Sequence, residues 1–365
     1  MSSSPAVCTA IAPGPLPLPA ALQCEYPLDP AAAALIARSR AAVRAILSGH
    51  DPRLLVVVGP CSIHDPEAAL DYADRLAAMA QGHRQELLVV MRTYFEKPRT
   101  RIGWKGLIND PHRDGSCDIV TGLRRARRVL TGVAERGLPA ASELLDPLIA
   151  PYLTDGLSWA AIGARTVESQ PHRCLASDLP LPVGLKNSTD GNLATAIDAA
   201  LTAMRPHTVL APGTDGRPAV RRTQGNPDVH LVLRGGRQSP NHDPATVRTA
   251  TAAAHAAGLR TGLMIDCSHA NAAKDPVRQA QLVRALCTRI ATGDAAPHAV
   301  MIESNIIAGN QDPAHMPLVY GRSITDPCID MATTGDLLAQ LARSVRIRGE
   351  CRRTDPAGEP VLHSG

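Results

Sequence analysis

Four residues of metal-binding type stand at or just beyond the ends of apolar runs in this 365-residue sequence. Cys61 and His269 closely follow two such runs, Glu303 ends a third, and Asp326 lies in Gly321-Arg-Ser-Ile-Thr-Asp-Pro. A thiolate, an imidazole and two carboxylates form a mixed donor set that suits Mn, Fe, Co or Zn better than Mg. Each residue alone is more often a packed or hydrogen-bonded side chain, so their shared placement carries the prediction of one divalent metal ion.

Cationic side chains form a second group at the ends of these runs. Arg or Lys ending an apolar strand is partly buried, which is costly unless an anion compensates the charge. Because the arginine fork matches phosphate and carboxylate, the expected ligand carries several negative charges, with Glu96-Lys-Pro-Arg-Thr100 as a second anion-binding candidate. The alternative is that these cations pair with Glu143, Asp266 or Glu303. The group comprises Arg92, Lys97, Arg99, Arg165, Lys186 and Arg234.

Nine short apolar runs, separated by helix-like stretches, must position these groups. Continuous apolar runs of this kind are typical of strands buried on both faces of a parallel sheet. About eight βα units in a chain of this length predict an α/β protein with a (β/α)8 TIM barrel, whose catalytic groups lie at the carboxyl ends of the strands. An open doubly wound sheet is the alternative. The runs are Leu54–Gly59, Leu87–Arg92, Leu138–Glu143, Trp159–Arg165, Pro182–Lys186, His207–Ala211, Val229–Arg234, Gly262–Asp266 and His298–Glu303.

One of the nine runs is expected to lie outside the barrel. His207–Ala211 leads only into Pro-Gly-Thr-Asp-Gly, a turn-rich stretch, whereas the remaining runs end on or beside a polar residue. We therefore predict an inserted β-hairpin between barrel units, over about residues 207–224. The expected organisation is an N-terminal arm and helix over residues 1–49, a catalytic barrel over 50–350 and a C-terminal tail over 351–365.

Composition excludes several classes of protein. Only eight aromatic residues and a net charge of +4 argue against a nucleic-acid partner. Nine cysteines without a C-x-x-C pair predict reduced thiols and a cytoplasmic location. No apolar run approaches the roughly 20 residues of a membrane span, so no membrane partner is expected. The arginines from Arg124 to Arg128 are expected on a solvated or subunit-contacting helix face.

Lys186 has an alternative role, since a buried lysine could also act as the Schiff-base residue of an aldolase.

Several longer strings around these residues are specific in both content and order. They are Gly59-Pro-Cys-Ser-Ile-His-Asp-Pro66, Glu96-Lys-Pro-Arg-Thr100, Ile102-Gly-Trp-Lys-Gly-Leu-Ile-Asn-Asp-Pro111, Ala161-Ile-Gly-Ala-Arg-Thr166, Pro182-Val-Gly-Leu-Lys-Asn187, Leu233-Arg-Gly-Gly236, Met264-Ile-Asp, Ser268-His-Ala-Asn271, Gly309-Asn-Gln311 and Ser323-Ile-Thr-Asp326. From about residue 16 to residue 347 the chain resembles the type I 3-deoxy-D-arabino-heptulosonate 7-phosphate (DAHP) synthases.

This resemblance implies an enzyme that opens the shikimate pathway by a metal-dependent condensation of phosphoenolpyruvate with D-erythrose 4-phosphate, giving DAHP and phosphate. It assigns the metal ion to Cys61, His269, Glu303 and Asp326. It assigns phosphoenolpyruvate to Arg92, Gly163, Ala164, Arg165, Lys186 and Arg234. It assigns erythrose 4-phosphate to Lys97, Pro98, Arg99, Thr100 and Asp326. The expected catalytic residues are Lys97 for proton transfer, Lys186 for holding the charged substrate and Glu143 for positioning water.

The resemblance also bears on regulation and assembly. In feedback-regulated members the hairpin helps to form a pocket for an aromatic amino acid, but Pro180, Val209 and Ala211 here replace larger or hydroxyl-bearing residues. We therefore expect weak or no inhibition by Phe, Tyr or Trp. Separately, the resemblance implies a homodimer or homotetramer. A Cys61–Cys328 disulfide is a further hypothesis for the metal-depleted protein. Two competing functions are a catalytically silent regulatory barrel and a sugar-acid phosphate synthase that uses another aldose.

Overall fold

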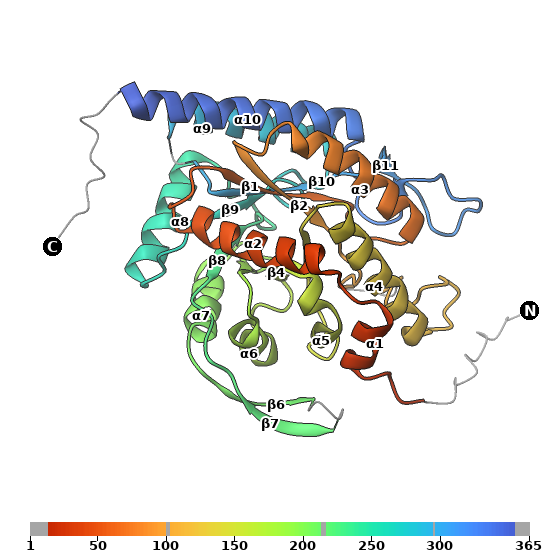
Figure 1. Ribbon diagram of the computed structural model, residues 1–365. Coiled ribbons are helices and arrows are strands. Elements are labelled where there is room, and N and C mark those ends of the chain that lie inside the picture. The colour runs from red at the N-terminus through yellow and green to blue at the C-terminus, as the bar shows by residue number, and fades with distance from the viewer. Residues whose placement is uncertain (1–13, 100–102, 213–216, 295, 355–365) are drawn as a thin grey trace, which may run out of the picture.

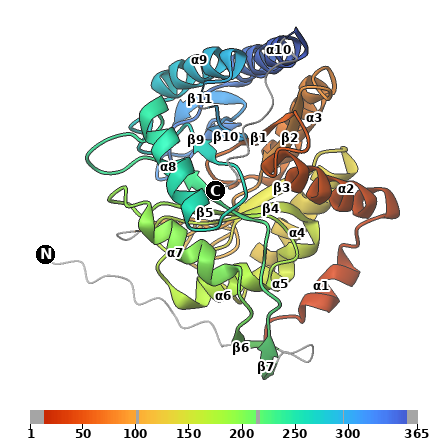
Figure 2. The same ribbon diagram turned by 90° about the vertical axis from the view of Figure 1, so that its left-hand side faces the viewer.

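Eight parallel strands close into a barrel in the computed structural model, which describes residues 14–99, 103–212, 217–294 and 296–354. Figure 2 shows the surrounding ring of helices. The predicted TIM barrel is confirmed, and closure of the sheet excludes the open doubly wound alternative. In their order around the barrel the strands are β1 (Leu54–Gly59), β2 (Leu87–Arg92), β3 (Ala140–Glu143), β4 (Leu157–Ile162), β5 (Val183–Lys186), β8 (Val229–Leu233), β9 (Met264–Asp266) and β10 (Ala299–Glu303).

The helices begin at strong local signals. Four of the described helices start with an Asp N-cap followed by Pro at the first position, as in Asp65-Pro66, where the Asp65 carboxylate accepts from the Ala68 N–H. The carboxylate satisfies an N–H that has no partner within the helix, and proline needs none. The described helices are α1 (Pro19–Glu25), α2 (Pro30–Leu47), α3 (Pro66–Gln81), α4 (Ile119–Glu135), α5 (Ala150–Leu153), α6 (Gln170–Asp178), α7 (Ala194–Ala203), α8 (Pro244–Ala256), α9 (Pro276–Thr292) and α10 (Met331–Thr354), with the single-turn η1 (Thr154–Gly156).

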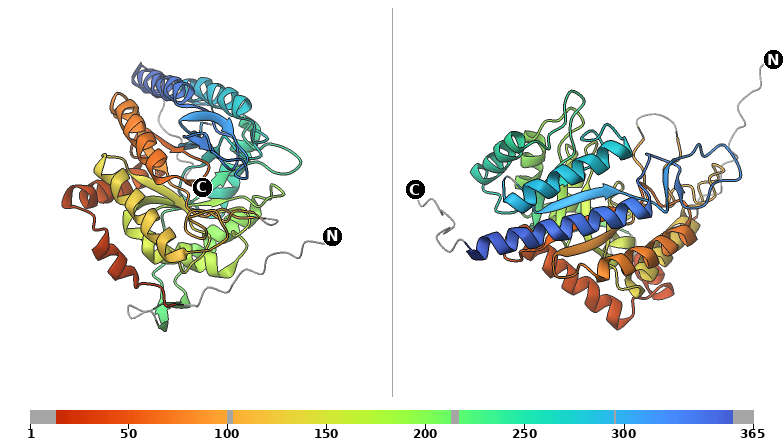
Figure 3. Two further views of the ribbon diagram at one scale, coloured as in Figure 1. Left: turned by 90° about the vertical axis from the view of Figure 1, so that its right-hand side faces the viewer. Right: turned by 90° about the horizontal axis from the view of Figure 1, so that it is seen from above.

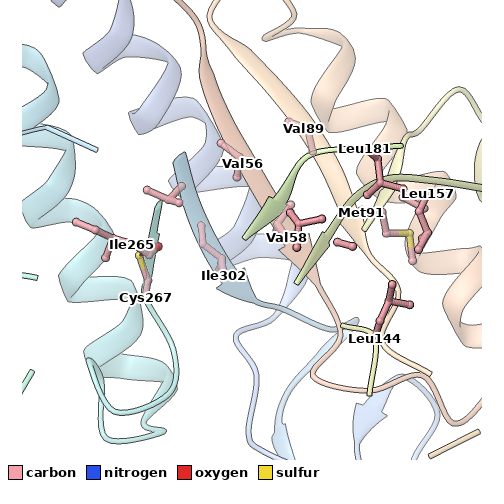
Figure 4. Close-up of a cluster of buried hydrophobic side chains, with 14 of the residues drawn as sticks. Val56, Val58, Val89, Met91, Leu144, Leu157, Leu181, Ile265, Cys267 and Ile302 are labelled. Atoms are coloured by element: carbon pink, nitrogen blue, oxygen red, sulfur yellow. The ribbon is translucent and has the colours of Figure 1, made fainter. Parts of the chain in front are cut away.

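Alternate residues of each strand face two different cores. In β1, Val56 and Val58 point outward and pack under the helices, as Figure 4 shows for the cluster around them. Leu55 and Val57 point inward and join the separate cluster that fills the barrel interior. Because alternate residues face the barrel interior and the surrounding helices, both sets are buried, and the strands are therefore apolar throughout.

Helix α2 closes the amino-terminal end of the barrel. Its Val43, Ile46 and Leu47 belong to the same buried cluster as the inward residues of the strands.

Helix α1 was not predicted, because the proline-rich arm lacks helical periodicity. It is anchored by the buried Leu22 and lies beside α5, where the Tyr152 hydroxyl donates to the Pro17 carbonyl at 2.7 Å.

The predicted hairpin is confirmed as β6 (Thr208–Pro212) paired antiparallel with β7 (Pro218–Arg222). It connects α7 to β8 and lies below α5 and α6 in the view of Figure 1. A second small sheet, of β11 (Ile307–Asn310) and β12 (Arg322–Ser323), follows the last barrel strand and was not predicted. The left view in Figure 3 shows the barrel from the side opposite to that in Figure 2, and the right view, from above, shows the long α10 beside α9.

Three expectations about the periphery need correction. Strand β4 ends at Ile162, so Arg165 lies in the following turn and not on the strand. Arg127 is fully buried and not on a solvated face, because it forms an ion pair with Asp155 and donates to the Tyr26 carbonyl. Helix α10 continues to Thr354, beyond the expected boundary at residue 350.

Of the helices in the described ranges, none has the length and apolar character needed to cross a membrane.

The deepest histidine of the barrel should make stability sensitive to acid. Burial lowers the pKa of His230 to about 4, with His298 contributing, and Trp159 Nε1 donates to its Nε2 at 2.8 Å. The unfolded chain, with a histidine pKa near 6.5, therefore binds more protons below that pH, so the free energy of unfolding falls as the pH drops from 6.5 toward 4. We expect His230 to account for about 2–3 kcal/mol of this loss by pH 4.5.

Urea unfolding at pH 7 and pH 4.5 would measure this effect in the wild type and in His230→Gln, which keeps an acceptor for Trp159 but does not titrate. The variant should lose less stability than the wild type between the two pH values. Equal losses in both proteins would contradict the assignment to His230.

Candidate active site

The inward-facing residues at the carboxyl ends of the strands are charged. Val90, Ala141 and Met301 point into the apolar interior of the barrel. Because every second residue of a strand points inward, Arg92, Glu143 and Glu303 also point inward, one layer closer to the carboxyl ends of the strands. Lys186 of β5 and Asp266 of β9 complete this layer, and all five side chains are buried. A charged layer thus lies directly on the apolar filling of the barrel, where each charge needs a nearby partner.

Three of the four predicted metal-ligating residues lie together. The ligand atoms of Cys61, Glu303 and Asp326 all lie within 4.8 Å of one another, and Cys61 and Glu303 are buried. Burial raises the pKa of the Cys61 thiol, and the Glu303 carboxylate adds to this, while Lys97 opposes it. Lys97 Nζ lies 3.1 Å from Cys61 Sγ, and Arg92 Nη2 lies 2.7 Å from Glu303 Oε1.

The fourth predicted ligand, His269, lies beside this cluster. Its Nε2 is 3.8 Å from Glu303 Oε1, while its Nδ1 is 2.8 Å from Asp266 Oδ2 and 3.1 Å from the Ser268 hydroxyl. Asp266 therefore orients the ring with Nε2 toward the cluster, in the manner of carboxylate–histidine pairs at metal sites. Sequence reasoning named Asp266 only as a potential partner for the cations.

Lys186 lies between two buried carboxylates. Its Nζ is 3.3 Å from Glu143 Oε2 and 3.5 Å from Asp266 Oδ2. Burial alone would lower the pKa of Lys186, but Tyr94, Glu143 and Asp266 outweigh burial and raise it. The amine is thus held as an ammonium, which disfavours the Schiff-base role because that chemistry needs a neutral amine. The alternative weighed above, that the cations form internal ion pairs, therefore holds for Lys186 and for Arg92.

A cavity of about 330 Å³ opens above this layer. Six cations and two carboxylates, Glu143 and Asp326, are among its described lining residues, so its charge is strongly positive. Burial and the neighbouring Arg165 lower the pKa of Arg234, which reflects this crowding of like charges. An excess of four cations over carboxylates suits a ligand with several negative charges. The cations are Lys97, Arg99, Arg165, Lys186, Arg234 and Lys274.

Gly163 makes room for the Glu143 side chain. A Cβ placed on Gly163 would lie 2.3 Å from Glu143 Oε1, so any larger residue would displace this carboxylate. Glu143 in turn holds Lys186, and Ala164, next along the chain, lines the cavity. Gly163 is not itself among the described residues that line the cavity, so its assignment to phosphoenolpyruvate stays a prediction.

The predicted aldose-binding segment borders the same cavity. Lys97, Pro98 and Arg99 line it, and Arg99 Nε donates to the Trp104 carbonyl at 2.7 Å. Trp104 is itself anchored, since its Nε1 donates to the Asp110 carbonyl at 2.8 Å. Thr100, which was also predicted to bind the aldose, lies outside the described residues.

Comparison with known proteins identifies the chain. Residues 27–339 match the model of the DAHP synthetase I family. The chain belongs to this family. It is 49% identical over 341 residues to phospho-2-dehydro-3-deoxyheptonate aldolase of Corynebacterium glutamicum, covering 91% of this chain and 92% of that protein. It is 50% identical over 331 residues to the Phe-sensitive enzyme of Escherichia coli, covering 90% and 94%.

A solved structure agrees with this family assignment. The aldolase of the same name from Francisella tularensis superposes with a TM-score of 0.90 at 43% identity, covering 92% of this chain and 98% of that one. As a DAHP synthetase I family member the protein is an enzyme, a DAHP synthase of aromatic biosynthesis.

Some residues at the site of this DAHP synthetase I family member carried no signal in the sequence. The Lys274 ammonium lies 2.8 Å from Asp326 Oδ1, and its backbone N–H donates to the His269 carbonyl, so one residue contacts two predicted ligands. The buried Tyr94 is the second missed residue, and its ring centre lies 3.6 Å from the predicted Arg92 guanidinium. A charge followed two residues later by an aromatic, or a lysine in a loop, is too common to be singled out from sequence alone.

Proposed function

We propose that this enzyme condenses phosphoenolpyruvate with D-erythrose 4-phosphate at the cavity above the barrel, with one divalent metal ion. The observation that carries the proposal is the contact between a cavity rich in cations and the Cys61–Glu303–Asp326 cluster. Two phosphorylated substrates need the first feature, and activation of an aldehyde by a Lewis acid needs the second.

The donor set supports a metal ion of the Mn, Fe, Co or Zn class. Cys61, Glu303 and Asp326 present one sulfur and two carboxylate oxygens within 4.8 Å, and His269 presents Nε2 toward Glu303. Such a mixture of thiolate, imidazole and carboxylate suits transition metals better than Mg²⁺. When bound, the ion would polarise the aldehyde oxygen of erythrose 4-phosphate.

The remaining residues bind and orient the substrates in this proposal. Arg165, Lys186 and Arg234 offset the charges of phosphoenolpyruvate and hold its C3 carbon toward the aldehyde. Arg92 supports the same end of the substrate and is fixed by its ion pair with Glu303. After attack of C3 on the aldehyde carbon, water adds at C2 and phosphate leaves with cleavage of the C–O bond.

Two residues are proposed to act on protons and water. Lys97 lies at the cluster, 3.1 Å from Cys61 Sγ, so its ammonium can deliver a proton to the developing alkoxide of the aldose. Burial opposes its charge, but Cys61 and Glu303 raise the pKa of Lys97, so the proton donor is present at neutral pH. Glu143, with Oε2 near Lys186, is proposed to position the water at C2.

A silent regulatory barrel and a synthase for another aldose have less support. A silent barrel would have no need for a cavity lined by so many of the predicted substrate-binding cations. A synthase for another aldose fits less well with Lys97-Pro-Arg99. A homodimer or homotetramer and a cytoplasmic location also remain proposals, which rest on the sequence and the family. Cys61 and Cys328 are both buried and unbridged, so the disulfide of the metal-depleted protein also remains a hypothesis.

The decisive experiment is a metal add-back. The purified protein is stripped with a chelator, Mn²⁺ is restored, and loss of phosphoenolpyruvate is followed with and without erythrose 4-phosphate. We expect consumption only when both the metal ion and the aldose are present. A folded protein without turnover in any divalent metal would instead support the regulatory barrel or a different aldose.

The hairpin borders an apolar cavity whose lining predicts weak feedback inhibition. This cavity of about 620 Å³ is lined by Pro180, Val209 and Ala211 among others. The family resemblance implies larger or hydroxyl-bearing residues at these positions in feedback-regulated members. Because each missing hydroxyl removes a hydrogen bond of about 1 kcal/mol, binding should weaken about fivefold per lost bond. We therefore expect weak inhibition by Phe, Tyr and Trp, with half-maximal inhibition only above about 1 mM. Initial rates against increasing amino acid measure this.

A matched variant can strengthen that inference. Ala211→Ser restores one hydroxyl in the same cavity and should increase inhibition by at least one of the three amino acids. For the wild type, an inhibition constant below about 0.1 mM for any of them would contradict the prediction.

A further inference from the structure

Strand β9 leaves the barrel before its neighbour β10 ends. The last residue of β9, Asp266, pairs with Met301, and the Cys267 N–H donates to the Met301 carbonyl at 2.9 Å, whereas β10 continues to Glu303. In a parallel ladder the N–H and the carbonyl of one residue bond to the two residues that flank its partner. If β9 continued, it would therefore offer the Cys267 carbonyl and the His269 N–H to the backbone of Glu303.

The side chain of Gln279 takes this place beside Glu303. Gln279 Oε1 accepts from the Glu303 N–H at 2.9 Å, and Gln279 Nε2 donates to the Glu303 carbonyl at 2.8 Å. A side-chain amide presents an acceptor and a donor next to each other, as a strand does, so it can pair with both backbone groups of one residue. The Ile329 N–H also donates to the Glu303 carbonyl, at 3.1 Å, so the carbonyl has a second partner.

Helix α9 delivers Gln279 from its first turn. Asp275 caps the helix, and its carboxylate accepts from the Val277 and Arg278 N–H groups. Because α9 follows β9, this turn lies at the carboxyl ends of the strands, and helical side chains lean toward the helix N-terminus. Gln279 is 1% exposed, and the other buried residues of α9, which the structure describes in full, are aliphatic side chains and Cys287. A buried glutamine on this apolar face requires a partner, and Glu303 provides it.

The two ends of Glu303 are thus fixed by different residues. Arg92 Nη2 holds the carboxylate, at 2.7 Å from Oε1, and Gln279 holds the backbone. The turn that carries His269 is fixed in a similar way, because the Asn271 amide donates to the Asp266 carbonyl at 2.9 Å. Since a metal ion requires its ligand atoms in a narrow geometry, a shift of the end of β10 would change the donor set.

We propose that Gln279 is a positioning residue of the metal site. Its amide replaces β9 along the last residue of β10, so that the chain after β9 is free to bring His269 to the Cys61–Glu303–Asp326 cluster while Glu303 stays in register. The inference rests on the proposed function, because it requires that Glu303 and His269 hold the divalent ion. Gln279 is not among the described residues that line the substrate cavity, so its effect is expected on metal affinity through Glu303.

Calorimetric titration of Mn²⁺ into the chelator-stripped full chain tests this role. Gln279→Met keeps the length of the side chain but makes neither hydrogen bond, so the Kd for Mn²⁺ should rise at least about 10-fold, as for other outer-shell partners. Gln279→Asn keeps the amide but is too short to reach both backbone groups, so it should also raise the Kd, by at least about fivefold. The visible spectrum of the Co²⁺-loaded protein, which depends on donor geometry, should change in both variants. Urea unfolding checks that each variant is folded.

Asn226→Leu is the matched control. Asn226 is also a buried amide that satisfies backbone groups, the carbonyls of Ala176, Leu179 and Leu181, but it precedes β8 at the amino-terminal end of the barrel. This variant should lose stability and keep the Kd for Mn²⁺ within about twofold of wild type. A wild-type Kd in folded Gln279→Met would overturn the proposal, as would an equal rise in Asn226→Leu, which would indicate a general loosening of the barrel. Wild-type protein that binds no Mn²⁺ would instead refute the proposed metal-dependent function.

Discussion

Cys61→Ser is expected to reduce metal-activated condensation by at least about 1000-fold, because loss of a direct ligand should exceed the 10–100-fold effects typical of outer-shell changes. Cys61 Sγ is the soft donor of the Cys61–Glu303–Asp326 cluster, and a serine hydroxyl does not ionise to replace it. The substitution also removes the sulfur that Lys97 contacts at 3.1 Å. Rates across a Mn²⁺ titration, together with the bound metal per chain, measure the effect.

Cys287→Ser is the control for this experiment. Cys287 is also buried, but it packs on α9 in the outer core, away from the proposed ligands. This variant should lose some stability and keep its metal content and its rate. If Cys61→Ser retained a tenth of the wild-type rate with a normal metal content, Cys61 would not be a ligand.

Lys186→Met is expected to remove activity and stability together. Lys186 Nζ is the shared partner of the buried Glu143 and Asp266 carboxylates, so its removal leaves them poorly compensated. Breaking a buried ion pair in this way costs about 3–5 kcal/mol. The condensation rate should fall by about 1000-fold or more, since a fixed charge on the substrate is lost. Urea unfolding at pH 7 and kcat/KM for phosphoenolpyruvate measure the two effects.

A double variant separates the two roles of Lys186. Adding Glu143→Gln to Lys186→Met removes one of the uncompensated charges, so it should recover part of the lost stability. It should not recover activity, because the substrate still lacks its cation. If the double variant were less stable than Lys186→Met by the full cost of a second substitution, the electrostatic explanation would be wrong.

Much of the fold and the placement of the site could be predicted because they depend on local patterns. The apolar runs mark the barrel strands, and carboxyl ends of parallel strands meet at one end of a barrel. That rule gathered Cys61, His269, Glu303 and Asp326. The structure brings Cys61, Glu303 and Asp326 within 4.8 Å of one another, with His269 beside them. The end of β4 was placed too late, because Gly163 and Ala164 extend the apolar run beyond the last strand hydrogen bonds.

What could not be predicted depends on contacts between distant parts of the chain. Arg127 stands in an arginine-rich helix and looks solvated, but Asp155 and the Tyr26 carbonyl satisfy it in the interior. Lys274 reaches Asp326 across 52 residues, and no spacing rule connects them. The amides of Asn187 and Asn241 hold the loop of Arg234 through hydrogen bonds that leave no periodic trace in sequence.

The placement of the two tryptophans gives this enzyme a pair of intrinsic fluorescent reporters. Trp159 is fully buried in the barrel interior against His230, so its emission follows the integrity of the barrel. Trp104 is only partly buried, and its carbonyl is held by Arg99 in the segment that borders the substrate cavity. A single emission spectrum therefore contains a signal from the scaffold and another from the rim, and replacing either tryptophan isolates the other. Substrate binding, through Trp104, and global unfolding, through Trp159, can in this way be followed in one sample without an added label.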